Sequence, residues 1–204
     1  ETVSEQLFKK PNKSQKNIIA NKVSGIDSPM FVYIIENIQS IGFQEDLITI
    51  NEKQYINPIS NGSKKKYIFV LESTLKTDSN DSIFVISFKP YRNTNFNALS
   101  GTMTINSDKW AIQNIKAEPS KQDAMFNIAI QQLYEKVNGY WFPKQLNTNI
   151  SFNMLDVYTM MGIGKSYITE IEINKDLDRS NFSNADYVIS DKAGDSDDVI
   201  KAYR

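Results

Sequence analysis

The chain of 204 residues is long enough for one domain with a sizeable core or for two small ones. Its formal net charge of −1 gives no electrostatic reason to expect binding to nucleic acid or to an anionic membrane surface. It contains no cysteine and no histidine, which excludes disulfides, thiolate nucleophiles and the usual zinc ligands. A metallopeptidase or a zinc deaminase is therefore excluded. We expect a protein that is not an enzyme and needs no cofactor.

Residues 1–42 differ in pattern from the rest of the chain. The first half of this segment is polar, with sparse apolar positions at helical spacing, and it predicts a helical lead-in. Ser28 suits the N-cap and Pro29 the first position of a helix over residues 29–41, where apolar residues follow at helical spacing. Gly42 suits its end. We expect this amphipathic helix to lie against a sheet.

Segments in which apolar and polar residues alternate follow one another after Gly42, separated by turn-forming residues. This pattern is typical of successive antiparallel strands with one buried face. Residues 126–137 also fit helical spacing, and we favour the strand. Asn138 and Gly139 predict a tight turn, and Pro143 predicts a bulge or an edge. The predicted strands cover residues 47–50, 54–56, 66–74, 82–89, 99–105, 110–117, 126–137, 140–152 and 167–173.

These patterns predict an α+β fold that is mainly antiparallel β. We expect a curved sheet or half-barrel with one or two helices on its concave face. The predicted domain spans residues 1–175, with the helical lead-in over 1–42 and the antiparallel sheet over 43–175. Residues 176–204 are acidic and have few apolar anchors, so they predict a loosely held tail or linker.

An apolar set on the predicted sheet has two interpretations. It would form an ordinary hydrophobic core under the helix, or it would line a concave cavity that binds an acyl chain or another apolar ligand. The residues predicted to contact such a ligand are Phe69, Phe84, Ile86, Phe88, Trp110 and Ile112, with Leu71 beside them.

Residues 154–164 are unusually apolar for a connection between strands. If this segment is exposed, Met160 and Met161 would contact a partner. If the segment extends the two strands of a hairpin, its apolar residues belong to the core.

A carboxylate-based glycan hydrolase is a further hypothesis, because two carboxylates that meet in a cleft can cleave a glycosidic bond. The sequence alone does not pair the glutamates. The candidates are Glu72, Glu118, Glu170 and Glu172. No spacing of acidic residues predicts a metal site.

Six segments of the sheet region carry a resemblance to a known family. They are residues 48–58, 67–74, 86–90, 99–106, 110–112 and 138–143. Their order and spacing resemble the middle region of a family of large outer-membrane proteins of Gram-negative bacteria. Members of that family combine an N-terminal carboxypeptidase-regulatory-like domain, this middle region of unknown function and a C-terminal membrane β-barrel.

The resemblance implies a non-enzymatic domain on the periplasmic side of the outer membrane. Its implied partner is the membrane β-barrel of the same polypeptide, which the domain would scaffold or bind. The strand with Leu99, Gly101 and Ile105, followed by Trp110 and Ile112, is also similar to periplasmic lipoprotein carriers of the half-barrel type. That similarity implies a lipid or another apolar ligand as the alternative partner.

Overall fold

The computed structural model describes residues 1–9, 13–22, 42–43, 45–154, 158–183, 187–189 and 196–203. The chain divides into two compact units. One unit comprises Glu1–Val32 and Glu172–Arg204, and the other comprises Tyr33–Ile171. This division differs from the single domain expected over residues 1–175, because the two ends of the chain belong to the same unit.

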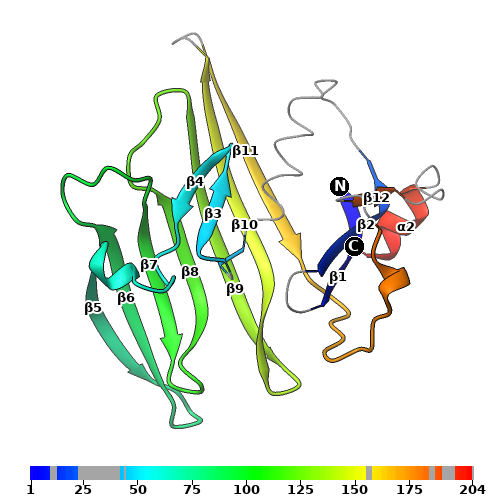
Figure 1. The fold of residues 1–204 in the computed structure, drawn as a ribbon, viewed down its shortest axis with the longest axis horizontal. Helices are drawn as coiled ribbons and strands as arrows, with labels where there is room; N and C mark the ends of the chain where they lie inside the picture. The colour runs from blue at the N-terminus through cyan, green and yellow to red at the C-terminus, as the bar shows by residue number, and fades with distance from the viewer. Residues whose placement is uncertain are drawn as a thin grey trace. The chain divides into compact units, whose positions relative to one another are not determined.

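The larger unit is built on a seven-stranded antiparallel sheet (Figure 1). Its strands are β5 (Tyr67–Lys76), β6 (Ser82–Pro90), β7 (Leu99–Asn106), β8 (Ala111–Pro119), β9 (Phe126–Val137), β10 (Tyr140–Met154) and β11 (Tyr158–Tyr167). They lie in the order β11-β10-β9-β8-β7-β6-β5, so each strand pairs with its neighbour in sequence. The mainly antiparallel fold is confirmed. The sheet is open, because its edge strands β5 and β11 do not pair with each other.

Several turns of this sheet use backbone in the left-handed region, and two of them concern residues singled out in the sequence. Asn138 and Gly139, with φ of 49° and 81°, form the predicted two-residue turn between β9 and β10. Lys109 and Trp110, with φ of 58° and 54°, lie in the turn between β7 and β8. Trp110 was expected to begin a strand, and β8 instead begins one residue later. Pro143 adjoins a bulge in the β9–β10 pairing, as predicted.

A hairpin covers part of one face of the sheet. It consists of β3 (Leu47–Ile50) and β4 (Lys53–Ile56), and the 3-10 helix η1 (Ser63–Lys65) follows it. We call the face under this hairpin the covered face and the opposite one the open face. The core between hairpin and covered face contains Ile48, Ile50 and Tyr55 from the hairpin, and Leu99, Met103, Ile115, Ile128, Ile130 and Ile150 from the sheet.

Tyr67 fixes the hairpin to the sheet. Its side chain is almost fully buried, its hydroxyl donates to the carbonyl oxygen of Ile56 in β4, and it accepts the backbone N–H of Leu99 at 3.1 Å. The backbone N–H of Ile56 also donates to the carbonyl oxygen of Asn97 at 3.1 Å. Because the hydroxyl satisfies groups on β4 and β7 together, it determines where the hairpin lies on the sheet.

Asn57 organises the chain around the hairpin. Its amide Nδ2 donates to the carbonyl oxygens of Phe43 at 3.1 Å and Glu45 at 2.7 Å, and its Oδ1 accepts the N–H of Ile59 at 3.1 Å. The side chain is buried, so these bonds replace water for three backbone groups. Asn57 therefore joins the segment before β3 to the segment after β4.

The smaller unit contains a three-stranded sheet. Strands β1 (Thr2–Lys9) and β2 (Lys13–Asn21) form an antiparallel hairpin, and β12 (Tyr187–Ile189) pairs parallel with β2. The 3-10 helix η2 (Arg179–Asn181) and the helix α2 (Ser196–Ala202) complete it, and α2 contacts β2. No helix of the described residues is long and apolar enough to cross a membrane.

Three expectations need correction. The helical lead-in is wrong for the described residues before 22, which form β1 and β2. Their sparse apolar positions fit either structure, and pairing with the distant strand β12 favours strands. The expected tail over 176–204 is not wholly loose, since it supplies β12 and α2. The last strand of the large sheet is β11, not residues 167–173.

The predicted helix over residues 29–41 lies outside the described residues. The helices expected on the concave face are therefore not supported by the described part of the structure. The predicted strand over Phe126–Val137 is confirmed as β9.

We expect Tyr67→Phe to lower the free energy of unfolding by about 2 kcal/mol or more, because it leaves the Leu99 N–H and the Ile56 carbonyl buried without their partner. Urea denaturation followed by circular dichroism measures this. The control is Tyr91→Phe, at an exposed tyrosine, for which we expect a change within about 0.5 kcal/mol. Equal effects of the two substitutions would show that the buried hydroxyl does not hold the hairpin.

Asp123 ties the other end of the hairpin to the sheet and should make this contact sensitive to acid. Its carboxylate accepts the backbone N–H groups of Met125 and Phe126 and pairs with Lys53 in β4 at 2.9 Å. The pKa of Asp123 is lowered to about 2. The largest cause is the hydrogen bond from the Met125 N–H, followed by the hydrogen bonds from Lys53 and from the Phe126 N–H. A folded-state pKa below the unfolded value gives a stabilising contribution that is complete above about pH 4 and is lost as the pH falls toward about 2.

We therefore expect Asp123→Asn to flatten the dependence of unfolding free energy on pH between about pH 4 and pH 2, measured by urea denaturation at each pH. Asp78→Asn, in the exposed turn between β5 and β6, is the control and should leave the slope unchanged. A slope that is identical in Asp123→Asn and the parent would contradict the role of this carboxylate.

Candidate functional site

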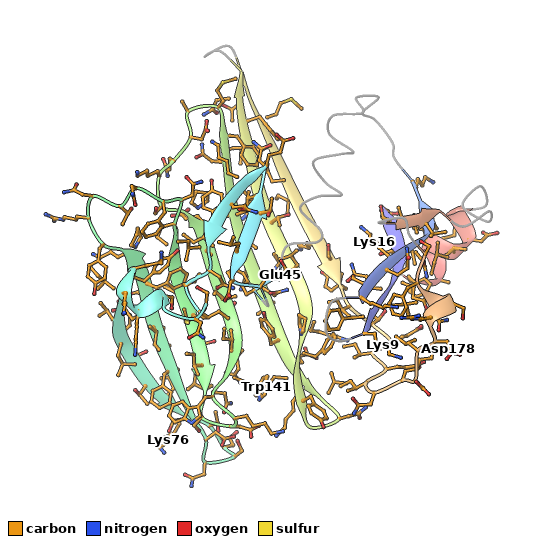
Figure 2. The ribbon with its side chains drawn as sticks, in the orientation of Figure 1. Lys9, Lys16, Glu45, Lys76, Trp141 and Asp178 are labelled. Atoms are coloured by element: carbon orange, nitrogen blue, oxygen red, sulfur yellow. The ribbon has the colours of Figure 1, made fainter. Side chains whose placement is uncertain are left out.

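An apolar patch lies on the covered face beyond the hairpin, from the edge strand β5 to the turn between β7 and β8. We define it as Phe69, Leu71, Phe84, Ile86, Trp110 and Ile112. The hairpin contacts the opposite end, where Asn97 and Asp123 bind it. Figure 2 labels Lys76 at the patch end, where β5 turns into β6, and Glu45 away from it, near the hairpin. The patch therefore continues the core beyond its cover.

Strand register explains why these side chains share a face. Phe69 pairs with Phe88 and Leu71 pairs with Ile86, and alternation along β6 places Phe84 on the same side. A bulge between Leu71 and Ser73 shifts the register of β5 beyond this point. The patch is thus bounded along β5 by the bulge.

Trp110 is the most exposed residue of the patch. Its side chain is 70% exposed, and its ring stacks on that of Phe84 with centroids 5.6 Å apart and planes inclined by 17°. A bulky residue rarely adopts a positive φ, which costs about 1–2 kcal/mol. The chain accepts this cost although the indole contributes little to the buried core. The conformation presents an aromatic surface to the outside.

Polar contacts hold the turn that carries Trp110. Asp108 accepts from Lys136 in β9 at 2.6 Å, and Lys109 donates to the carbonyl oxygen of Gly139 at 2.6 Å. The hydrogen bond from Lys136 is the main cause that lowers the pKa of Asp108. The Asn106 side chain accepts the N–H of Asp108 at 2.7 Å. Two neighbouring turns are thereby joined, which restrains the backbone on both sides of Trp110.

The structure separates the six residues predicted to bind an apolar ligand. All lie on the covered face, but Phe88 is 2% exposed and packs edge-to-face on Tyr67, so it belongs to the core. Ile86 and Ile112 are half-buried and pack against the core. The accessible members are listed by decreasing exposure as Trp110, Leu71 and Phe69. A ligand-binding role for them stays a prediction.

The two methionines predicted to contact a partner point in opposite directions. Residues 158–164 extend the β10–β11 hairpin, as one interpretation expected. Met160 pairs with Phe152 on the covered face and is half-buried, whereas Met161 lies on the open face and is 83% exposed. Only part of this apolar segment therefore belongs to the core.

A shallow polar groove of about 300 Å³ lies on the open face. Two of its lining residues, Gln131 and Asn147, belong to a row of side-chain amides that runs from β8 to β10. Gln131 Nε2 donates to Asn114 Oδ1 at 3.1 Å, Asn147 Nδ2 donates to Gln131 Oε1 at 3.3 Å, and Gln145 Nε2 donates to Asn147 Oδ1 at 2.8 Å. Gln145, Asn147 and Asn149 alternate along β10, but this alternation is typical of any solvent-exposed strand face and does not by itself predict a groove.

The groove does not supply the pair of carboxylates that glycan hydrolysis needs. Glu118 is the one carboxylate among its lining residues, and it lies on the same strand face as Lys116. Among the residues that the structure describes, no group of three or more acidic side chains is arranged to hold a metal ion. The apolar patch is therefore the stronger candidate for a functional surface.

We expect Trp110→Gly to change the free energy of unfolding by no more than about 1 kcal/mol, because relief of the positive φ offsets the lost stacking. Chemical denaturation measures this. The matched substitution Phe88→Ala, at the buried end of the same face, should cost about 3 kcal/mol or more. A loss at Trp110 as large as that at Phe88 would make the indole part of the core.

Comparison with known proteins places the chain in a family without assigning an activity. Residues 1–169 match the model of a family of unknown function, DUF5686. No curated protein and no solved structure matches the chain. Because the matched residues include the whole seven-stranded sheet with its covering hairpin, the chain belongs to the DUF5686 family of unknown function.

Proposed function

We propose that this protein is a non-enzymatic binding domain whose apolar patch docks a protein partner. The observation that carries the proposal is Trp110, which is 70% exposed, is held at a positive φ and is stacked on Phe84. Strained conformations that the core does not require are concentrated at functional sites. Exposed aromatic rings beside aliphatic side chains are typical anchors of protein interfaces.

The shape of the patch favours a protein surface over a small ligand. The strands that carry the patch belong to an open sheet. The β3–β4 hairpin covers another part of the same face and does not extend over the patch. Leu71 and Phe69, on the edge strand β5, are exposed to solvent, so no described residue encloses the patch on that side. A small apolar ligand gains affinity from burial on most sides, whereas a partner surface can cover an open patch.

The resemblance noted in the sequence supports a place for this domain. We propose that it lies on the periplasmic side of the outer membrane, as the middle part of a larger polypeptide. The partner would then be the membrane β-barrel of that polypeptide. The chemistry of the patch, apolar with one dominant aromatic ring, suits a partner that offers an apolar groove or loop.

An acyl lipid is the second candidate for the patch. The feature that favours it is the continuity of the patch with the core, since Ile86 and Ile112 pack on both. Lifting the hairpin would lengthen the apolar surface enough for an extended chain. The similarity to half-barrel lipoprotein carriers points the same way.

Photo-crosslinking in cells that express the protein tests the proposal. A photoreactive amino acid at Leu71 should give crosslinks to a protein partner, because this side chain is 59% exposed within the patch. The matched control is Val70, the adjacent residue on the open face, which is also exposed and should give none. Crosslinks of equal yield at both positions, or none at either, would contradict docking through the patch.

Native mass spectrometry of the gently purified protein, with solvent extraction, separates the two candidates. A near-stoichiometric acyl species that is lost in Leu71→Ser and retained in Val70→Ser would replace the protein partner with a lipid. A mass without added lipid, together with crosslinks at Leu71, supports the protein partner.

A further inference from the structure

In the described part of the structure, the strand β11 forms one edge of the large sheet. Within the described residues it pairs with β10 alone. The hydrogen bond from Ile168 N to the carbonyl oxygen of Lys144, at 2.8 Å, continues this ladder and fixes its phase. Because hydrogen-bonded and non-hydrogen-bonded pairs alternate in an antiparallel ladder, the N–H and C=O groups of Met161, Ile163 and Lys165 point away from β10.

This edge lacks the usual protection against pairing. The strand is ten residues long, contains no proline, and carries Lys165 as its one charged residue. Met161 and Ile163, both on the open face, are 83% and 77% exposed. Natural proteins block free edges with charges, prolines or bulges, so an unblocked edge with exposed apolar side chains indicates that another strand covers it.

The opposite edge of the same sheet shows such protection. Strand β5 has a bulge between Leu71 and Ser73, and the bulged Glu72 adds a charge that is hydrogen-bonded to Ser87. Lys76 adds a further charge at its end. Because β5 carries these protective features and β11 does not, we expect β11, and not β5, to pair with a further strand.

We propose that β11 pairs antiparallel with β11 of a second copy of this chain, around a two-fold axis at Gly162. The outward backbone groups require an odd-numbered residue to face an odd-numbered one. Centring at Gly162 places Met161 opposite Ile163 and Thr159 opposite Lys165, so each copy covers the exposed apolar pair of the other. A twofold axis makes this contact closed and self-complementary.

Other registers are less favourable. Centring on Ile163 would set Met161 against Lys165 and bury apolar surface beside an ammonium group. At Gly162 no atom lies within 4 Å of the place that a Cβ would occupy, so a side chain introduced there meets no obstruction within its own chain. The register at Gly162 therefore combines apolar contact with separation of the two lysines.

Cysteine crosslinking of the full chain tests the register, because the protein has no cysteine of its own. In Gly162→Cys the two thiols would occupy a non-hydrogen-bonded pair with Cα atoms about 4.5 Å apart, within the range of a disulfide. Mild oxidation should give a covalent dimer. Ile163→Cys and Val70→Cys, exposed on β11 and on the β5 edge, should crosslink far less. Equal crosslinking of the three variants would overturn the proposal.

Sedimentation velocity of the unmodified protein over a range of micromolar concentrations gives the second test. We expect a reversible dimer, and Ile163→Lys should weaken it at least about tenfold because it places charge in the centre of the contact. Val70→Lys, the control on β5, should leave the dimer unchanged. A protein that is monomeric throughout this concentration range would overturn the proposed self-pairing.

Discussion

The position of the Tyr67 hydroxyl determines how the rest of the large unit is divided between core and surface. It donates to the carbonyl of Ile56 in β4 and accepts the N–H of Leu99 in β7. The alternation of apolar and polar residues does not predict that these two strands are in contact. Once β4 is fixed there, the hairpin covers one end of the sheet face and leaves the other end uncovered. The same row of apolar side chains is thereby buried at Phe88 and exposed at Trp110.

The two ends of the covered face consequently differ in how completely their side chains are buried and hydrogen-bonded. At the hairpin end, buried polar groups such as Asn57 are fully bonded and the side chains interlock, as expected for structure. At the patch end, the chain keeps an unfavourable backbone conformation and an exposed indole. Glycine adopts a positive φ without strain, so at position 110 the stacking of the indole on Phe84 offsets a conformational cost that glycine would not have.

Alternation in the sequence was sufficient to predict the large sheet and the shared face of the apolar set, because side-chain direction in a strand depends on local periodicity. It was not sufficient to predict which members are exposed, since that depends on Tyr67 and Asp123 contacting the hairpin across long stretches of chain. The strands before residue 22 were missed for a similar reason, as their partner β12 lies far away in sequence. The groove is not predictable from alternation, because polar residues on one face of a strand are typical of any solvent-exposed sheet face.

The meander order of the large sheet has a consequence for how the protein opens. Every strand from β5 to β11 pairs with its sequence neighbour, so this sheet can assemble and recover through local contacts with little loop-closure cost. The hairpin, in contrast, depends on contacts with distant residues such as Asp123, which pairs with Lys53, and the preceding Phe43 donates its N–H to Gln132. Transient release of the hairpin would expose the core that Ile48, Ile50 and Tyr55 cover, and would join the buried and exposed apolar surfaces into one continuous track.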